Sequence, residues 1–153
     1  MGLTLLLAAC GGSALSLEEY VERMQTATDE LEAAGEQFVA VAQSAVDPDT
    51  GAVVDAAALQ RLLDDTATAL EDYFEELESL EAPPEIEDAH NAFLAVARPR
   101  LEQWVGAADR ASEIETFDEL RTVTLKTPEF TGRCMGLEQA AGDSGLQLDL
   151  DCG

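Results

Sequence analysis

Apolar residues recur along most of the chain at alternating spacings of four and three, the pattern of helices that bury one face. Ser16 precedes the first stripe, and Glu19 three residues later completes a capping box that predicts where this helix begins. Gly35 on the stripe weakens a helix but lets a neighbouring element approach, so we expect close packing there. The stripe consists of Leu17, Val21, Met24, Thr28, Leu31, Gly35, Phe38, Ala42 and Ala45.

Turn residues 47–51, with the sequence Asp-Pro-Asp-Thr-Gly, follow the first stripe. Their Asp-x-Asp-x-Gly order is similar to a calcium-binding loop. However, the glycine comes one position early for an EF-hand, and the loop lacks the glutamate that closes one. We interpret the segment as a turn, with calcium binding as the alternative.

Asp55 is a good N-cap for a second helix, and Pro83-Pro84 ends it, with Pro84 suited to the first position of a third. The second stripe consists of Leu59, Leu63, Thr66, Leu70, Tyr73, Leu77 and Leu80. Pro99 interrupts the third stripe and predicts a kink or a new segment. That stripe consists of Ile86, His90, Phe93, Ala97, Leu101, Trp104, Ala108 and Ala111.

Thr116 and Glu119 form another capping box, which opens a fourth helix. Its stripe keeps one phase across Pro128, which favours a kink there, although Thr127-Pro128 would equally cap a new segment. The stripe consists of Leu120, Val123, Thr127, Phe130, Cys134, Leu137 and Ala141. From Asp143 onward leucines alternate with polar residues, which indicates an extended strap with Leu146, Leu148 and Leu150 turned inward.

Four amphipathic helices joined by short turns predict an all-α fold, an antiparallel four-helix up-and-down bundle with kinks near Pro99 and Pro128. In that layout the start of the first helix, the turn between the second and third, and the end of the fourth share one end of the bundle. The strap would run back along the fourth helix.

The chain of 153 residues carries 32 acidic and 8 basic side chains, a formal charge of −24. Such a charge repels nucleic acid and anionic lipid head groups, which need clustered Lys and Arg. Nucleic-acid binding is therefore excluded. We expect the acids to coat solvent-facing helix surfaces.

An apolar run, Leu3–Ala9, leads into Cys10 and the small residues that follow. This stretch resembles the lipobox of bacterial lipoproteins, in which the signal is cleaved before a cysteine that takes up acyl chains such as palmitate. The run is far shorter than the about 20 apolar residues that span a bilayer, and it lacks the Lys or Arg of an ordinary signal peptide. We interpret residues 1–9 as a signal peptide with a truncated or misassigned start, 10–15 as a lipidated tether and 16–153 as the domain.

With Cys10 assigned to lipid, Cys134 and Cys152 remain as an even pair. An exported protein meets an oxidising compartment, so we expect a disulfide that pins the C-terminal strap. Two free thiols in a reducing cytosol are the alternative if the lipobox interpretation fails.

The whole chain is similar to a group of small acidic bacterial lipoproteins. The shared patterns are the lipobox, a helix opening like Ser16–Tyr20, a Pro-Pro-Glu…His turn at 83–90, and an ending like Cys134…Cys152. The resemblance implies an exported helical domain, held at the bacterial cell envelope by the lipid on Cys10, and implies no known activity.

Glu87 and His90 form a Glu-x-x-His pair on one helix face, and Tyr73 should lie near the same level. A di-iron bundle needs two such pairs, and the chain has one histidine, so that centre is excluded. A weak mononuclear metal or ligand site is one interpretation of this group. A core histidine satisfied by a carboxylate or a tyrosine hydroxyl is the one we favour.

We expect no cofactor, no stoichiometric transition metal and no enzymatic activity. Arg98, Arg100 and Trp104 are the only local basic and aromatic patch, which fits either a partner or ordinary packing. The predicted function is therefore a non-enzymatic, membrane-anchored binding or interaction module with a protein or small-ligand partner. A small-ligand or metal carrier with its site near His90 is the alternative, and a cavity between helices would favour it.

Overall fold

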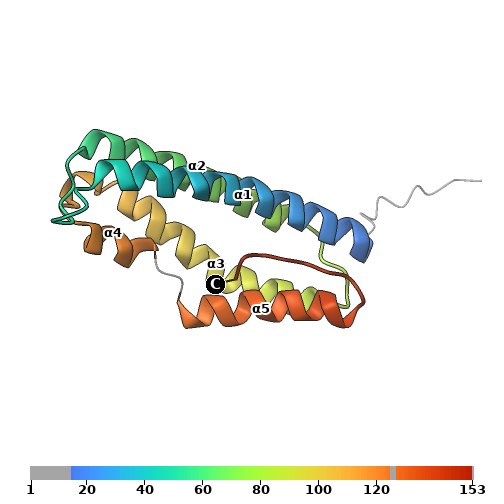
Figure 1. Cartoon of the computed structure of the whole chain (residues 1–153). Helices are drawn as coiled ribbons and strands as arrows, with labels where there is room; N and C mark the ends of the chain where they lie inside the picture. Colours follow the sequence, from blue (N-terminus) through green and yellow to red (C-terminus); the bar gives the residue numbers. More distant parts are fainter. Residues whose placement is uncertain (1–14, 125–126, 153) are drawn as a thin grey trace, which may run out of the picture.

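The computed structural model of the chain describes residues 15–124 and 127–152, and Figure 1 shows their arrangement. This part is all-helical, as the hydrophobic pattern predicts, and two isolated β-bridges are its only extended pairings. In chain order the elements are α1 (Leu17–Ala45), α2 (Ala56–Ser79), α3 (Glu87–Ala108), the short 3-10 helix η1 (Ala111–Glu113), α4 (Phe117–Thr124) and α5 (Pro128–Asp143).

The first two helices begin where their caps predict. Ser16 Oγ accepts a hydrogen bond from the Glu19 amide, and the Glu19 carboxylate accepts one from the Ser16 amide. The Ser16 hydroxyl also donates to Glu19 Oε2 at 2.7 Å. This bond, with the one from the Ser16 amide, holds the pKa of Glu19 below its usual value. Asp55 caps α2 by accepting from the Ala58 amide at 2.8 Å.

The segment between α1 and α2 is the predicted turn. Asp47 Oδ1 accepts from the amides of Thr50 and Asp49, at 2.8 and 3.0 Å. The same contacts, first that from the Thr50 amide, lower the pKa of Asp47. Gly51 then takes a φ of +71°, in the left-handed region that favours glycine.

The third helix begins three residues later than Pro84, so that start was predicted wrongly. Residues 83–86 form a turn closed by the Ile86 amide on the Pro83 carbonyl, and Ile86 is the N-cap. The helix then continues through Pro99 and does not restart there. Proline removes one helical hydrogen bond, but both Pro99 and Ala95, whose carbonyl loses it, are exposed, so water can replace the donor.

The predicted fourth helix is two helices, and the kink expected at Pro128 is wrong. Pro128 is the first residue of α5, and Thr127 is its N-cap, accepting from the Phe130 amide at 3.2 Å. Proline disfavours helical geometry in the preceding residue, and Thr127 accordingly has an extended backbone, with φ −81° and ψ 151°. The capping alternative for Thr127-Pro128 is confirmed.

Consecutive long helices run in opposite directions, and α1 packs along α2, α2 along α3 and α3 along α5 (Figure 1). A closed four-helix up-and-down bundle also needs the first and last helices to pack along each other. Here the C-terminal tail, residues 144–152, lies between α5 and α1 (Figure 1). The four-helix arrangement is therefore not confirmed, although the all-helical class is.

The tail turns back on α5 through a Schellman motif. The Leu146 amide reaches the Ala141 carbonyl and the Gly145 amide the Gly142 carbonyl, while Gly145 has a φ of +88°. Leu148 and Leu150 are buried and their polar neighbours are exposed, which confirms the predicted alternation.

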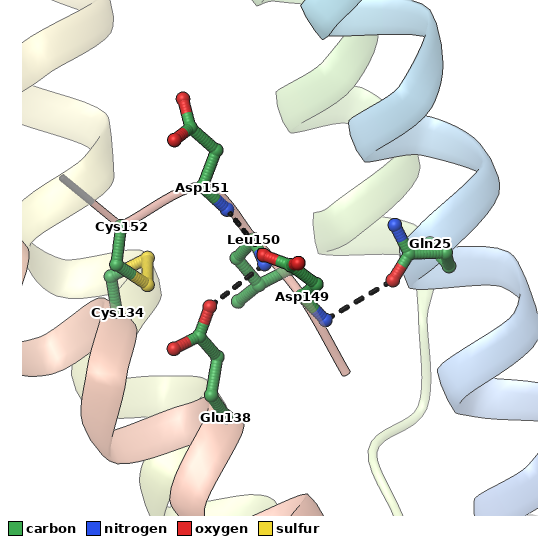
Figure 2. The surroundings of a disulfide bond; sticks show 7 residues. All are labelled: Gln25, Cys134, Glu138, Asp149, Leu150, Asp151 and Cys152. Carbon is green, nitrogen blue, oxygen red and sulfur yellow. Dashed lines mark hydrogen bonds between the residues drawn. A yellow bond between two sulfur atoms is a disulfide. The ribbon is translucent and has the colours of Figure 1, made fainter. Parts of the chain in front are cut away.

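A disulfide between Cys134 and Cys152 pins the tail to α5, as predicted (Figure 2). Two side-chain acceptors hold the backbone of the tail between two helices. Gln25 of α1 accepts from the Asp149 amide at 3.1 Å, and Glu138 of α5 accepts from the Leu150 amide at 2.8 Å. The tail thus links α5 to α1 by hydrogen bonds to both helices.

Candidate functional site

A groove opens in the middle of the molecule, bounded by α1, α2, α3, the start of α5 and the tail. Its volume is about 580 Å³, within the range of roughly 300–1,000 Å³ typical of ligand pockets. Its walls are largely apolar and rich in aromatic rings. The apolar side chains that line it include Leu31, Leu70, Tyr73, Phe74, Phe93, Trp104, Phe130 and Leu150.

The central part of the α1 stripe is less buried than its ends, at the position of the groove. Met24 and Ala42, toward the two ends of that stripe, are buried, whereas Leu31 and Phe38 are half-buried and Gly35 is exposed. A Cβ added at Gly35 would meet no atom within 4 Å outside its own helix backbone and chain neighbours. The close packing expected at Gly35 is therefore wrong.

The break between α4 and α5 explains why this stripe is uncovered. A continuous fourth helix would run past the middle of α1, whereas α4 and α5 are separate and α5 packs on α3. Leu150 and Asp151 of the tail contribute to the wall of this gap.

Charged side chains stand at the edges of the groove. Glu32 and Glu36 project from α1 and Asp151 from the tail, while Arg100 comes from α3. The Arg100 guanidinium lies 6.0 Å from the centre of the Trp104 ring and donates to Gln103 Oε1 at 3.3 Å. Burial lowers the pKa of Arg100 from its usual value, which reflects incomplete hydration of that charge.

The predicted patch of Arg98, Arg100 and Trp104 is not one surface, because Arg98 lies apart from the other two. Arg100 and Trp104 line the groove, and the Trp104 ring packs edge-on against Phe38. Arg98 is exposed and forms an ion pair with Glu78 of α2. Two of the three residues thus belong to one hollow.

The candidate group of Glu87, His90 and Tyr73 is not brought together as a ligand set. His90 is buried, and its Nδ1 shares a hydrogen bond of 2.7 Å with the hydroxyl of Tyr20. Glu87 is exposed, and Tyr73 lines the groove, which does not include His90. The expectation of a core histidine satisfied by a tyrosine hydroxyl is confirmed, with Tyr20 as its partner.

Cys134, Glu138 and Cys152 are the one group of three potential metal ligands found close together in the described ranges. Both sulfur atoms are in the disulfide, so neither is the thiolate that a metal needs. In the predicted turn, the Asp47 carboxylate accepts hydrogen bonds from backbone amides and from the Thr50 hydroxyl.

A second hollow, of about 640 Å³, lies on the seam between α1 and α2. Charged side chains dominate its lining, and the ion pair of Arg23 with Glu76, N to O 2.5 Å, joins the two helices there. The central groove is smaller but mostly apolar, which is the character of sites that bury small molecules.

Cys10 and the leader before it lie outside the described residues, so their predicted roles stay predictions. Among the helices that the structure describes, none is both long and apolar enough to cross a membrane. Comparison of the chain with protein-family models, curated proteins and solved structures finds no match.

Sequence reasoning did not identify the groove, because all of its aromatic residues except Phe74 lie on stripes that predict ordinary core. Two signals pointed to it in retrospect. Gly35 stands where a larger core residue is expected, and Thr127-Pro128 carries the signature of a helix start. Together they mark the position at which α1 loses its covering helix.

Proposed function

We propose that the protein is a lipid-anchored, extracytoplasmic binding module that holds a small, largely apolar ligand in its central groove. The groove is the observation that carries this proposal. It gathers aromatic and aliphatic side chains of four helices and the tail around one hollow, in which Val39 is exposed and Leu31 and Phe130 are half-buried. Such a surface is unfavourable in water and becomes favourable when a ligand covers it.

A non-enzymatic role fits the state of the single histidine. His90 is buried and hydrogen-bonded to Tyr20, away from the residues that line the groove. The groove instead offers shape, aromatic surface and a few charges at its edge, which are the means of binding rather than of acid–base chemistry. The proposed ligand site is therefore the groove and not the surroundings of His90.

Binding in the groove can be tested with a neutral fluorescent probe, N-phenyl-1-naphthylamine, whose emission rises in apolar surroundings. The full chain should carry Cys10→Ser, so that no acyl chain competes. We expect saturable binding that Gly35→Leu abolishes, because the new side chain would project into the groove. Gly136→Leu, at an exposed helical glycine outside the groove, is the matched control and should bind normally.

Retention of probe binding in Gly35→Leu, with the fold intact by circular dichroism, would place the probe elsewhere and contradict the proposal. Anchoring is tested separately, by metabolic labelling with palmitate in a bacterial host. The lipobox resemblance predicts that labelling is lost in Cys10→Ser. Equal labelling of the two proteins would remove the lipid anchor from the proposal and leave the groove untouched.

A further inference from the structure

The charges around the groove indicate which ligand it selects. This inference rests on the proposed function, because it concerns the occupant of the same groove. Two carboxylates of α1, Glu32 and Glu36, stand one helical turn apart at its edge, and Asp151 of the tail is a third. Among the described residues that line it, Arg100 of α3 is the one cationic side chain.

Glu32 and Glu36 differ from two acids of α2 that face a neighbouring helix. Glu76 and Glu78 of α2 form ion pairs with Arg23 and Arg98. Within the described residues, by contrast, neither Glu32 nor Glu36 makes a hydrogen bond or an ion pair. Like charges four residues apart repel each other along a helix, and a bound cation would relieve that repulsion.

The aromatic lining favours the same sign of charge. Tyr73, Phe74 and Phe93 line the groove as buried side chains, and Phe130 is half-buried. Aromatic rings attract cations to their faces. The chain as a whole carries a charge of −24, which concentrates cations near its surface and repels anions.

The positive charge of Arg100 would repel a bound cation nearby, but the Arg100 side chain already interacts with other groups of the protein. It lies over Trp104, donates to Gln103 and has further interactions. Its charge on the α3 wall would orient a ligand rather than exclude one. A cationic group would lie toward Glu32 and Glu36 of α1, with the apolar body along the aromatic wall.

The geometry points to an amphiphile with a cationic head group, of the alkylammonium class, as the ligand of the groove. A matched series of decyltrimethylammonium, decanoate and decanol, each displacing the neutral probe from the full-length Cys10→Ser chain, tests this assignment. We expect the ammonium compound to bind about tenfold more tightly than decanoate, the scale of two or three partly screened charge contacts. Added salt should reduce the difference.

The variant Glu32→Gln/Glu36→Gln should weaken binding of the ammonium compound severalfold and leave that of decanol unchanged. Its control is Glu18→Gln/Glu22→Gln, which removes an equally spaced acidic pair of α1 that does not line the groove. An equal loss in the control would assign the effect to the overall charge and overturn the role of Glu32 and Glu36.

The remaining outcomes separate this inference from the proposed function. Tightest binding of decanoate, lost in Arg100→Gln, would overturn the cationic assignment in favour of an anionic ligand. Equal binding of all three compounds would also overturn it, while the groove kept its role as an apolar site. Absence of binding by the neutral probe and by all three compounds would contradict the proposed function itself.

Discussion

The hydroxyl of Tyr20 and Nδ1 of His90 share a 2.7 Å hydrogen bond between α1 and α3. Both side chains are buried, and their rings meet edge to face with centroids 5.6 Å apart. The helices α1 and α3 both pack on α2, so this bond ties together two helices across the interior. It satisfies a polar group of each helix that would otherwise be desolvated without a partner.

Loss of this hydrogen bond should destabilise the fold without unfolding it. We expect Tyr20→Phe to lower the free energy of unfolding by about 1–3 kcal/mol, because it leaves a buried imidazole nitrogen unpaired. His90→Gln should lower it by about 1 kcal/mol, the usual net value of one buried hydrogen bond. Urea denaturation followed by circular dichroism measures both. Values within error of the wild type would show that the bond adds nothing to stability.

The stability of the protein should fall on mild acidification. Burial lowers the pKa of His90, so the unfolded chain takes up its proton at a higher pH than the folded protein does. The contribution of neutral His90 is complete above the unfolded pKa of about 6.5 and decreases as the pH falls from there toward the folded pKa.

Parallel urea titrations of the wild type and His90→Gln between about pH 7.5 and pH 5 isolate this effect, because the many carboxylates titrate alike in both proteins. The difference in unfolding free energy between them should shrink, or change sign, as the pH falls. A difference that stays constant with pH would contradict a lowered pKa for His90. Glu19 and Asp47, whose pKa values are also lowered, should affect stability at lower pH.

Much of the fold was predictable because local signals coincide with the final packing. Ser16 and Asp55 mark helix starts through their own hydrogen bonds, and the stripe of α2 is buried throughout. The break at Pro128 was not decided by the pattern, since the apolar phase is the same on both sides of it. The separate bounds of α4 and α5 and the N-cap hydrogen bond of Thr127 show that the chain starts a new helix there.

The candidate site was predictable only in fragments. Tyr73, Arg100 and Trp104 were singled out and do line the groove, but for other reasons than their shared position. Within residues 15–124 and 127–152, the groove lies where no helix covers the middle of α1, and the sequence of α1 around Leu31 does not indicate this. The pairing of His90 with Tyr20 depends likewise on the relative positions of α1 and α3.

The disulfide should hold the tail in place and stabilise the whole domain. The double variant Cys134→Ala/Cys152→Ala removes a cross-link between residues 18 apart in sequence. We expect a loss of about 3 kcal/mol in unfolding free energy on the chain-entropy model. Hydrogen exchange at the amides of Asp149 and Leu150, which bond to Gln25 and Glu138, should accelerate more than exchange in the core. Unchanged exchange at these two amides would show that the hydrogen bonds hold the tail without the cross-link.

Gly35 provides a test of the uncovered stripe that needs no ligand. It lies in the middle of α1, is exposed, and would place a Cβ where no neighbouring atom lies within 4 Å. Alanine there avoids the entropic penalty of glycine in a helix, so Gly35→Ala should raise the free energy of unfolding by about 0.5–1 kcal/mol. Gly51→Ala is the contrasting variant, because its φ of +71° strains any residue with a Cβ, and we expect it to be destabilising. Destabilisation by Gly35→Ala in urea denaturation would instead mean that another part of the chain packs closely against Gly35, and the groove would then be closed at its centre.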